Sequence, residues 1–188
     1  MSFFSARVRL LRHGLVFGLL FSLMPGVQAQ SLQQAPQIQV GFSPEGSAEQ
    51  LVLQVIDSAR SQLRVMGYSF SSPKVVKALI QAKRRGVDVL VVVDARGNDN
   101  RSSHAAMNLL ANAGIPLRTN AAYKIQHDKV VISDEKNVQT GSFNYSSAAA
   151  KSNSENVLVL WGVPAAATVY LQHWQSRWEQ GNPYQPSY

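Results

Sequence analysis

The sequence predicts an α/β fold, in which a mixed β-sheet is flanked by helices within a single domain. The first observation is size and composition, because 188 residues with 45% hydrophobic content fit one globular domain. The second is periodicity, since short strand-like stretches alternate with stretches of helical spacing. The third is the run VDVLVVVD at residues 87–94, which lacks polar alternation. Such a run is typical of a strand that helices cover on both faces of a sheet.

The N-terminal half of the domain predicts three strands and three helices in alternation. The strands are expected at residues 38–42, 63–70 and 87–94, and the helices at residues 47–62, 72–86 and 104–114. The first helix carries apolar residues at helical spacing from Leu51 to Ala59. The second has Pro73 near its first turn and Gly86 at its end, which are common start and stop signals. A polar loop at 95–103 precedes the third helix.

In the C-terminal half the expected strands follow one another without helices between them. The stretches KVVISD, NVQTGSF and ENVLVLWG predict strands joined by short turns, which makes the sheet a mixed one. A closing helix is expected at 164–180, with four apolar residues set for packing: Val169, Leu171, Trp174 and Trp178. Residues 181–188 are expected to form a C-terminal tail.

Residues 1–29 have the composition of an export signal. The basic start MSFFSARVRLLRH is followed by the apolar run LVFGLLFSLM and by PGVQA, and cleavage before Gln30 would suit Val27 and Ala29. A retained membrane anchor is the competing interpretation, but the apolar run is about half of the roughly 20 residues that a spanning helix needs. We therefore expect an exported protein, periplasmic or secreted, with no stable membrane association after cleavage. A flexible lead-in at 30–36 would precede the domain at 37–180.

Charge and composition narrow the chemistry. The formal net charge of +7 falls to +4 once the three arginines of the signal are removed, and this positive balance favours an anionic partner. Cysteine is absent, which excludes disulfides, a thiolate nucleophile and Cys-ligated zinc. No H-E-x-x-H motif, Cys/His array or EF-hand loop is present, so no metal and no cofactor is expected. Asp94 and Asp99 could still bind Mg²⁺, although a loop carboxylate more commonly solvates a turn.

The stretch HDKVVISD at 127–134 places an imidazole and an ammonium group side by side. In a strand alternate side chains share one face, so His127 and Lys129 are expected to point the same way and Asp128 the opposite way. Val130 and Ile132 would then fill the core-facing side. Taken singly, a histidine is more commonly a structural residue, and a strand lysine is usually a solvated edge residue.

Four polar residues follow this pair at strand ends. Asp134 falls at the end of the motif strand, Ser142 and Asn144 repeat the alternation within GSFN, and Glu155 opens the strand ENVLVLWG. Each alone would be an ordinary turn residue, loop hydrogen-bonder or surface charge. Their order behind an H-x-K pair is what makes the set a candidate site.

This constellation resembles the HKD signature of the phospholipase D superfamily. HDKVVISD followed by GSFNYS and SEN places His127, Lys129 and Asp134 at the motif positions. Ser142, Asn144 and Glu155 match the downstream positions of the family. The most similar branch is that of small exported bacterial endonucleases typified by the nuclease Nuc. The resemblance covers residues 38–178 and is most specific over 127–155, and it implies a phospholipase D-like α/β sandwich.

The resemblance implies a metal-independent phosphodiesterase that works through a phosphohistidine intermediate. A neutral imidazole can attack phosphorus and split one difficult displacement into two easier ones, and His127 is the candidate. Lys129 and Asn144, with Ser142 as a further donor, would bind the phosphate and stabilise developing negative charge. In the family the partner that fixes the imidazole tautomer is the glutamate that matches Glu155. Asp134, the remaining motif residue, is more consistent with a structural or pKa-tuning role.

A second acid is needed to protonate the leaving oxygen, and this chain has a single H-x-K motif. Beyond the signal, only His104 and His173 remain, and neither begins such a motif. By resemblance, a two-fold homodimer would bring His127 of each subunit into one shared site.

Nucleic acid is the expected substrate, DNA with RNA left open. Arg96, Arg101 and Lys124 could contact backbone phosphates, although ordinary surface charge explains them equally well. Tyr145 could stack on a base, but core packing is the simpler interpretation. Two alternatives stay open: a phospholipase D-like lipid phosphodiesterase and a non-catalytic nucleic-acid-binding protein.

Overall fold

Strands and helices alternate along the computed structural model, which describes residues 1–2 and 35–186. The strands are β1 (Gln37–Ser43), β2 (Gln62–Gly67), β3 (Asp88–Asp94), β4 (Leu117–Asn120), β5 (Lys129–Ser133), β6 (Asn137–Gly141), β7 (Glu155–Trp161) and β8 (Asn182–Pro183). The helices are α1 (Ser47–Ser58), α2 (Pro73–Arg84), α3 (Arg101–Asn112), α4 (Ser147–Lys151) and α5 (Pro164–Gln180), with a short 3-10 turn η1 (Arg96–Asn98).

The strands form one mixed sheet in the order β1-β7-β6-β5-β2-β3-β4-β8. β2, β3 and β4 run parallel to one another, whereas the other neighbouring pairs are antiparallel. This confirms the predicted α/β domain with a mixed sheet. No helix among the described residues is long and apolar enough to cross a membrane. The predicted signal peptide and most of the predicted lead-in lie outside the described residues.

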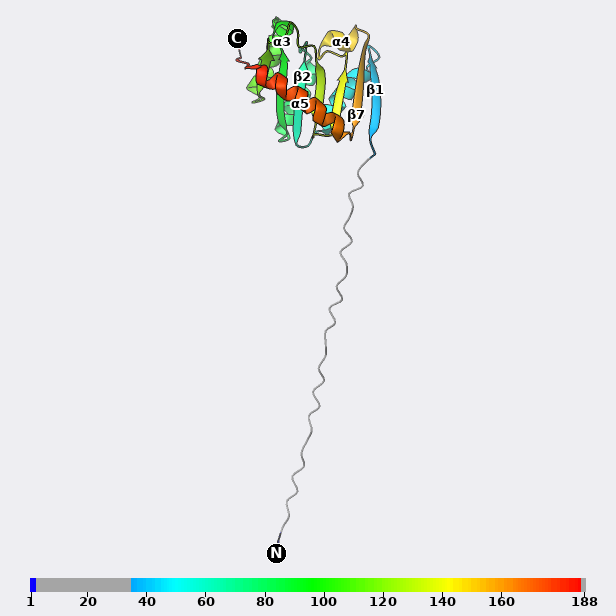
Figure 1. The fold of residues 1–188 in the computed structure, drawn as a ribbon, viewed down its shortest axis with the longest axis vertical. Coiled ribbons are helices and arrows are strands. Elements are labelled where there is room, and N and C mark those ends of the chain that lie inside the picture. The colour runs from blue at the N-terminus through cyan, green and yellow to red at the C-terminus, as the bar shows by residue number, and fades with distance from the viewer. Residues whose placement is uncertain (3–34, 187–188) are drawn as a thin grey trace. The chain divides into compact units, whose positions relative to one another are not determined.

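Each face of the sheet buries its own apolar cluster. On one face α1, α2 and α3 pack against side chains such as Val65, Val91 and Val131. On the other face α5 crosses the strands (Figure 1), and its Trp174 packs with Met66 and Ile132. Because both faces are covered, the central strands are apolar on both sides, as the run of β3 predicts.

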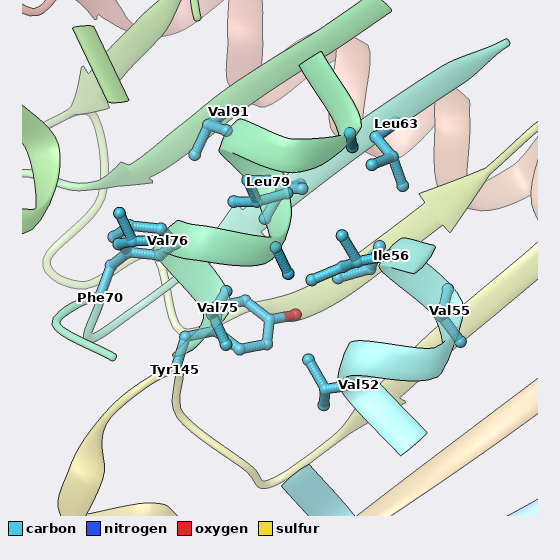
Figure 2. Packing of buried hydrophobic residues seen from close by; sticks show 14 of the residues in the cluster. Val52, Val55, Ile56, Leu63, Phe70, Val75, Val76, Leu79, Val91 and Tyr145 are labelled. Carbon is cyan, nitrogen blue, oxygen red and sulfur yellow. The ribbon is translucent and has the colours of Figure 1, made fainter. Parts of the chain in front are cut away.

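The first cluster also holds Tyr145, which is fully buried. Its ring lies among Val52, Ile56 and Val75 of the two helices α1 and α2 (Figure 2). The buried hydroxyl group donates a hydrogen bond of 2.9 Å to Oε1 of Gln139, and burial raises the pKa of Tyr145 well above its ordinary value. Tyr145 is therefore a core residue, and stacking on a base is excluded for it.

Two predicted helix boundaries are wrong for identifiable reasons. α1 was expected to reach residue 62, but it ends at Ser58. The next backbone amides, from Arg60 to Gln62, donate instead to the carboxylate of Asp134. α3 was expected to begin at residue 104, but it begins at Arg101, because the side chain of Asn100 caps it by accepting from the amide of Ser103.

Three short elements and one exposed residue differ from the sequence-based expectations. β4, α4 and β8 were not predicted, and β8 lies in the segment expected as a tail. It pairs with β4, and the amide of Tyr184 donates to the carbonyl of Leu117. On α5, Trp174 is buried as expected, but Val169 is 65% exposed.

Candidate active site

The strand ends that carry the predicted site residues meet at one edge of the sheet. β2 and β3 end there at Gly67 and Asp94, and the antiparallel β5 begins there at Lys129, which pairs with Gly67. β6 ends at Gly141, which pairs with Val157 near the start of β7. We call this set of strand ends the site edge. The carboxyl ends of parallel strands are a common position for ligand sites in α/β folds.

His127 lies at the site edge in the extended segment that leads into β5, and it is exposed. The expectation that His127 belongs to the strand is wrong, because pairing with β2 begins at Lys129 and the chain after Gly67 leaves the sheet. The imidazole centroid lies 4.7 Å from the ring centroid of Tyr68, and the two ring planes are inclined by 54°. Because His127 is exposed, a substrate can reach its imidazole beside the Tyr68 ring.

Lys129 differs from His127 in being only 4% exposed. Its Nζ atom donates a hydrogen bond of 2.8 Å to the carbonyl of His127 and lies 5.0 Å from the centroid of the Tyr68 ring. Burial lowers the pKa of Lys129 from its ordinary value of 10.5 to about 8, although the negative charges of Asp128 and Glu155 oppose that shift. The side chains of His127 and Lys129 therefore share one side, as the spacing predicts, and the ammonium group is still largely charged at neutral pH.

Asp128 points away from this pair, as expected for the intervening residue. Its Oδ1 atom lies 3.0 Å from Nε2 of His173 on α5. This contact connects the segment that enters β5 to α5, which covers the face of the sheet away from α1, α2 and α3. His173 thus pairs with Asp128 and not with any of the six predicted site residues.

Ser142 and Glu155 contact each other where β6 ends and β7 begins. The Ser142 hydroxyl donates a hydrogen bond of 2.6 Å to Oε2 of Glu155 and accepts one of 3.0 Å from the amide of Asn156. The other oxygen of Glu155 accepts from Nδ2 of Asn153 at 2.9 Å. In the described part of the chain, the carboxylate of Glu155 is thus directed to Ser142 and Asn153, and its charge acts on Lys129.

Asn144 approaches the same region from the segment after β6. Its Oδ1 atom accepts a hydrogen bond of 3.4 Å from the amide of Ser69, the residue after Tyr68. With Oδ1 used in this way, the Nδ2 group is the donor that a substrate oxygen could meet. Five of the six predicted site residues therefore converge on the site edge: His127, Lys129, Ser142, Asn144 and Glu155.

Asp134, the sixth, lies at the opposite end of β5 from His127. Its carboxylate accepts hydrogen bonds from the amides of residues 60–62 and from the Ser61 hydroxyl, at 2.8 to 3.1 Å. Burial acts to raise the pKa of Asp134, but these hydrogen bonds outweigh burial and hold that pKa below its ordinary value. The structure does not bring Asp134 together with the other site residues, and its contacts are those of an anchor between β5 and the start of β2.

The predicted phosphate contacts separate into two kinds. Arg96 donates through Nη1 to the carbonyls of Tyr123 and Lys124, at 2.9 and 3.0 Å, so it braces the loop before the motif. Arg101 and Lys124 are exposed. Arg96 is exposed as well, but its guanidinium group is engaged by the carbonyls of Tyr123 and Lys124.

The two aspartates considered for Mg²⁺ have other partners. Asp94 is buried, and its carboxylate accepts from the amides of Gly97 and Gln126, both at 2.6 Å. Asp99 lies 3.3 Å from Nε2 of His104. No cluster of three or more metal-ligating side chains occurs among residues 1–2 and 35–186.

The comparisons with known proteins agree with this geometry. The family described as "Cardiolipin synthase, PLD-like domain" matches residues 52–178, which includes the whole HKD stretch. The chain belongs to the phospholipase D superfamily. Phospholipase D of Rickettsia bellii (strain RML369-C) is 33% identical over 155 residues, covering 81% of this chain and 76% of that protein. Human mitochondrial cardiolipin hydrolase is 31% identical over 163 residues, and the chain spans 64% of its length.

Solved structures place the chain within the superfamily more closely. A phospholipase D family member, Nuc from Salmonella typhimurium, is 57% identical with a TM-score of 0.79, covering 80% of this chain and 99% of Nuc. NucT from Helicobacter pylori shares the fold, with 21% identity and a TM-score of 0.68 over 79% of this chain and 99% of that chain. The predicted resemblance to the Nuc branch is confirmed. So is the predicted enzyme class, a phospholipase D-like hydrolase of phosphodiester bonds.

Sequence reasoning missed one residue of this superfamily site. Tyr68 was placed inside a strand expected at 63–70, whereas β2 ends at Gly67 and the ring turns toward His127 and Lys129. An aromatic residue directly after an apolar strand is the signal that could have marked it, because strand ends in α/β folds carry ligand-facing residues.

Proposed function

We propose that the protein is a non-specific endonuclease that cleaves DNA without a metal ion, with RNA as a second substrate class. The observation that carries the proposal is the pairing of an exposed imidazole, His127, with the buried ammonium group of Lys129 on one aromatic wall. A phosphodiester needs a nucleophile and a fixed cation at the same place, because its own negative charge repels an incoming nucleophile. The 57% identity to Nuc supports a nuclease over other members of the superfamily.

The reaction proceeds in two displacements at phosphorus. A ring nitrogen of His127 attacks, a nitrogen–phosphorus bond forms, and the bond to the leaving ester oxygen breaks while a second imidazole protonates that oxygen. That imidazole then takes a proton from water, the water oxygen attacks phosphorus, and the bond to His127 breaks. Throughout, the Lys129 ammonium group and Nδ2 of Asn144 stabilise the charge on the non-bridging oxygens, and the Ser142 hydroxyl joins them when its hydrogen turns from Glu155 to the phosphate.

Glu155 supports this chemistry through two neighbours. Its charge favours the ammonium form of Lys129, and its Oε2 atom holds the Ser142 hydroxyl at 2.6 Å. The tautomer-fixing bond to His127 that the resemblance implies stays a prediction. It requires the carboxylate to exchange the Ser142 or Asn153 contact for the imidazole when substrate enters.

The second imidazole comes from a second copy of the chain in a two-fold homodimer. An uncovered apolar surface supports this assembly: Ile38, Val40 and Phe42 of β1 are 69%, 54% and 53% exposed. They pair with Leu160, Leu158 and Asn156 of β7, and Gly41 between them faces α1, so the three side chains lie on the α5 face of the sheet.

This apolar surface leads directly to the site edge. In the same ladder, the residue after Phe42 is Ser43, which pairs with Glu155. A copy packed on this surface would bury three large apolar side chains and bring two site edges close to a shared two-fold axis. Sedimentation of the active protein tests the assembly. A monomer with full activity would refute the shared site.

A plasmid-nicking assay in excess chelator tests the chemistry. Wild type should nick the plasmid, and His127→Ala should lose cleavage while it retains binding in a gel-shift measurement. His104→Ala is the matched control, since His104 is a half-buried histidine that pairs with Asp99 outside the candidate site. Complete loss of wild-type activity in chelator would instead favour metal-dependent hydrolysis.

A lipid phosphodiesterase is the second candidate, because relatives at 31–33% identity carry the names phospholipase D and mitochondrial cardiolipin hydrolase. Comparing turnover of single-stranded DNA, RNA and phospholipid vesicles separates this activity from a nuclease. A non-catalytic nucleic-acid-binding protein predicts no cleavage by wild type or by the His127→Ala variant.

Non-specific substrate binding is assigned to exposed cations around the site edge. Lys124 is exposed within the loop that enters the motif, Arg101 is exposed at the start of α3, and Arg96 contributes by bracing the loop. Phosphate contacts of this kind make binding strongly dependent on salt and weakly dependent on sequence. Neutralising Lys124 should therefore weaken binding similarly for unrelated DNA sequences.

Export to the periplasm or the medium is part of the same proposal and rests on the composition of residues 1–29. N-terminal sequencing of the mature protein is the test. A chain that begins at Gln30 is expected, and one that begins at Met1 would refute cleavage.

A further inference from the structure

Tyr68 occupies the wall against which both reacting groups of the HKD pair lie. Its ring centroid is 4.7 Å from that of His127 and 5.0 Å from Nζ of Lys129. The first distance is typical of a packed aromatic pair, and the second of a cation–π contact. One side chain outside the HKD motif therefore contacts both the nucleophile and its cation.

The backbone of Tyr68 is held by a buried asparagine. Asn98 is 1% exposed, and its Nδ2 donates to the Tyr68 carbonyl at 2.6 Å while its Oδ1 accepts from the Phe70 amide at 2.8 Å. Nδ2 also donates to the carbonyl of Asp94 at 2.8 Å, at the end of β3. The segment that carries Tyr68 is thus fixed to the neighbouring strand rather than free to move.

One edge of the Tyr68 ring lies against a glycine, Gly97. A Cβ atom at Gly97 would lie 2.8 Å from Cε2 and 3.1 Å from Cδ2 of Tyr68, so no larger residue fits without moving the ring. The buried Asp94 carboxylate joins this support to the motif, because it accepts from the amides of Gly97 and of Gln126, the residue before His127. Gly97, which contacts the Tyr68 ring, and the segment that leads to His127 are thus held by the same carboxylate.

We propose that Tyr68 is a positioning residue of the active site, whose ring, supported by Gly97, sets the imidazole of His127 and the ammonium group of Lys129 in their reactive arrangement. The inference rests on the proposed phosphodiesterase function and assigns no chemical step to Tyr68. Both neighbours contact the ring: Nζ of Lys129 lies over it, and the imidazole of His127 is inclined to it by 54°.

This wall also bears on the protonation of Lys129. Burial lowers its pKa to about 8, so the ammonium form is close to being lost in the physiological range. An aromatic face attracts a cation, whereas an aliphatic side chain of similar size does not. Tyr68 therefore helps to keep Lys129 charged while it excludes water from one side of the group.

The test compares Tyr68→Phe with Tyr68→Leu. Phe keeps the ring and removes the hydroxyl group, so kcat should stay within about 2-fold of wild type if the ring face is what matters. Leu removes the ring, and kcat should fall by roughly 10- to 100-fold with little change in KM, because reacting groups set in the wrong place lose rate rather than binding. The alkaline limb of the pH–rate profile should move down by roughly half a pH unit for Leu alone.

Gly97→Ala provides an independent route to the same ring. Its added methyl group should push the ring and lower kcat in the wild-type background. In the Tyr68→Leu background only the milder contact with Oδ1 of Asp94, at 3.2 Å, remains, so the further loss of kcat should be much smaller. Unfolding curves for every variant separate this effect from loss of fold. Tyr184→Leu, at a half-buried tyrosine beside His104, is the control that should leave kcat unchanged.

The possible results distinguish an error in the positioning role of Tyr68 from an error in the proposed function. If wild type cleaves but Tyr68→Leu has normal kcat and pH dependence, or Tyr68→Phe is as slow as Leu, the positioning role is wrong. If wild type shows no cleavage that depends on His127, the proposed function is wrong instead. A carbon-13 NMR titration of Lys129, which needs no turnover, should still give a lower pKa in Tyr68→Leu than in Tyr68→Phe. Equal pKa values would refute the contact.

Discussion

Replacing Lys129 by methionine is expected to abolish cleavage and to stabilise the fold at neutral pH. Methionine fills a similar volume without a charge, and Lys129 is only 4% exposed. Burial lowers the pKa of Lys129 from 10.5 to about 8, despite the opposing charges of Asp128 and Glu155. The folded protein therefore holds at pH 7 a charge that its surroundings disfavour.

The magnitude follows from the two pKa values. The difference between 10.5 and about 8 corresponds to about 3 kcal/mol, at about 1.4 kcal/mol per pKa unit. The loss of the hydrogen bond from Lys129 to the His127 carbonyl offsets about 1 kcal/mol of that gain. The Lys129→Met variant should thus be more stable than wild type by about 2 kcal/mol at pH 7.

The pH dependence gives the prediction its sign. Between about pH 8 and 10.5 the unfolded chain binds more protons at position 129 than the folded one, so wild-type stability rises with pH across this window. The methionine variant lacks this contribution. Its advantage over wild type should shrink to about half near pH 9 and to about 0.4 kcal/mol by pH 9.5, and it should be gone before the pH reaches the ordinary lysine pKa.

Urea unfolding of both proteins at pH 7, 8.5 and 9.5 measures this difference, and the comparison cancels groups that both proteins share. Lys136→Met, at an exposed lysine in the turn after β5, is the matched control and should show neither effect. If Lys129→Met is less stable than wild type at pH 7, or if its advantage does not change with pH, the reasoning about a desolvated ammonium group is wrong.

Three further predictions concern the frame around the site. Asp134→Asn should destabilise the fold by about 2 kcal/mol, because it removes the charge that strengthens the four hydrogen bonds to Oδ1 and turns an NH2 group toward the Arg60 amide that now donates to Oδ2, yet leave kcat unchanged; urea unfolding and a nicking assay check both, and a large loss of kcat would contradict the anchor role. Gly41→Ala should lower the unfolding midpoint, because its Cβ would lie 2.8 to 2.9 Å from backbone atoms of α1; an unchanged midpoint would mean that α1 can shift. Asp128→Asn should lower the pKa of Lys129 and so move the alkaline limb of the pH–rate profile to lower pH, and an upward shift would contradict the assigned charge effect.

The order of strands and helices could be predicted because each element carries its own period. The apolar run of β3, with Pro73 and Gly86 marking the ends of α2, contains the information locally. The boundaries of α1 and α3 could not be predicted in the same way. The first depends on Asp134, a residue more than seventy positions away, and the second on a single capping bond from Asn100.

In the candidate site, too, features set by local sequence could be predicted and features set by distant contacts could not. The H-x-K spacing correctly places His127 and Lys129 on one side, because alternation in an extended chain is a local property. Tyr68 could not be assigned from spacing, since it meets the motif only through the pairing of β2 with β5. The strands β4 and β8 were not predicted, because strands of four and two residues are too short to show a periodic pattern.

The two borders of the sheet treat an approaching strand differently. At one border, β8 ends in Pro183, which has no amide hydrogen to offer and so discourages further pairing. At the other border, β1 is seven residues long, contains no proline and bears Ile38, Val40 and Phe42. In the proposed homodimer, a contact through β1 of each copy would leave only the β8 border uncovered, and so would give no repeating contact from which a fibre could grow.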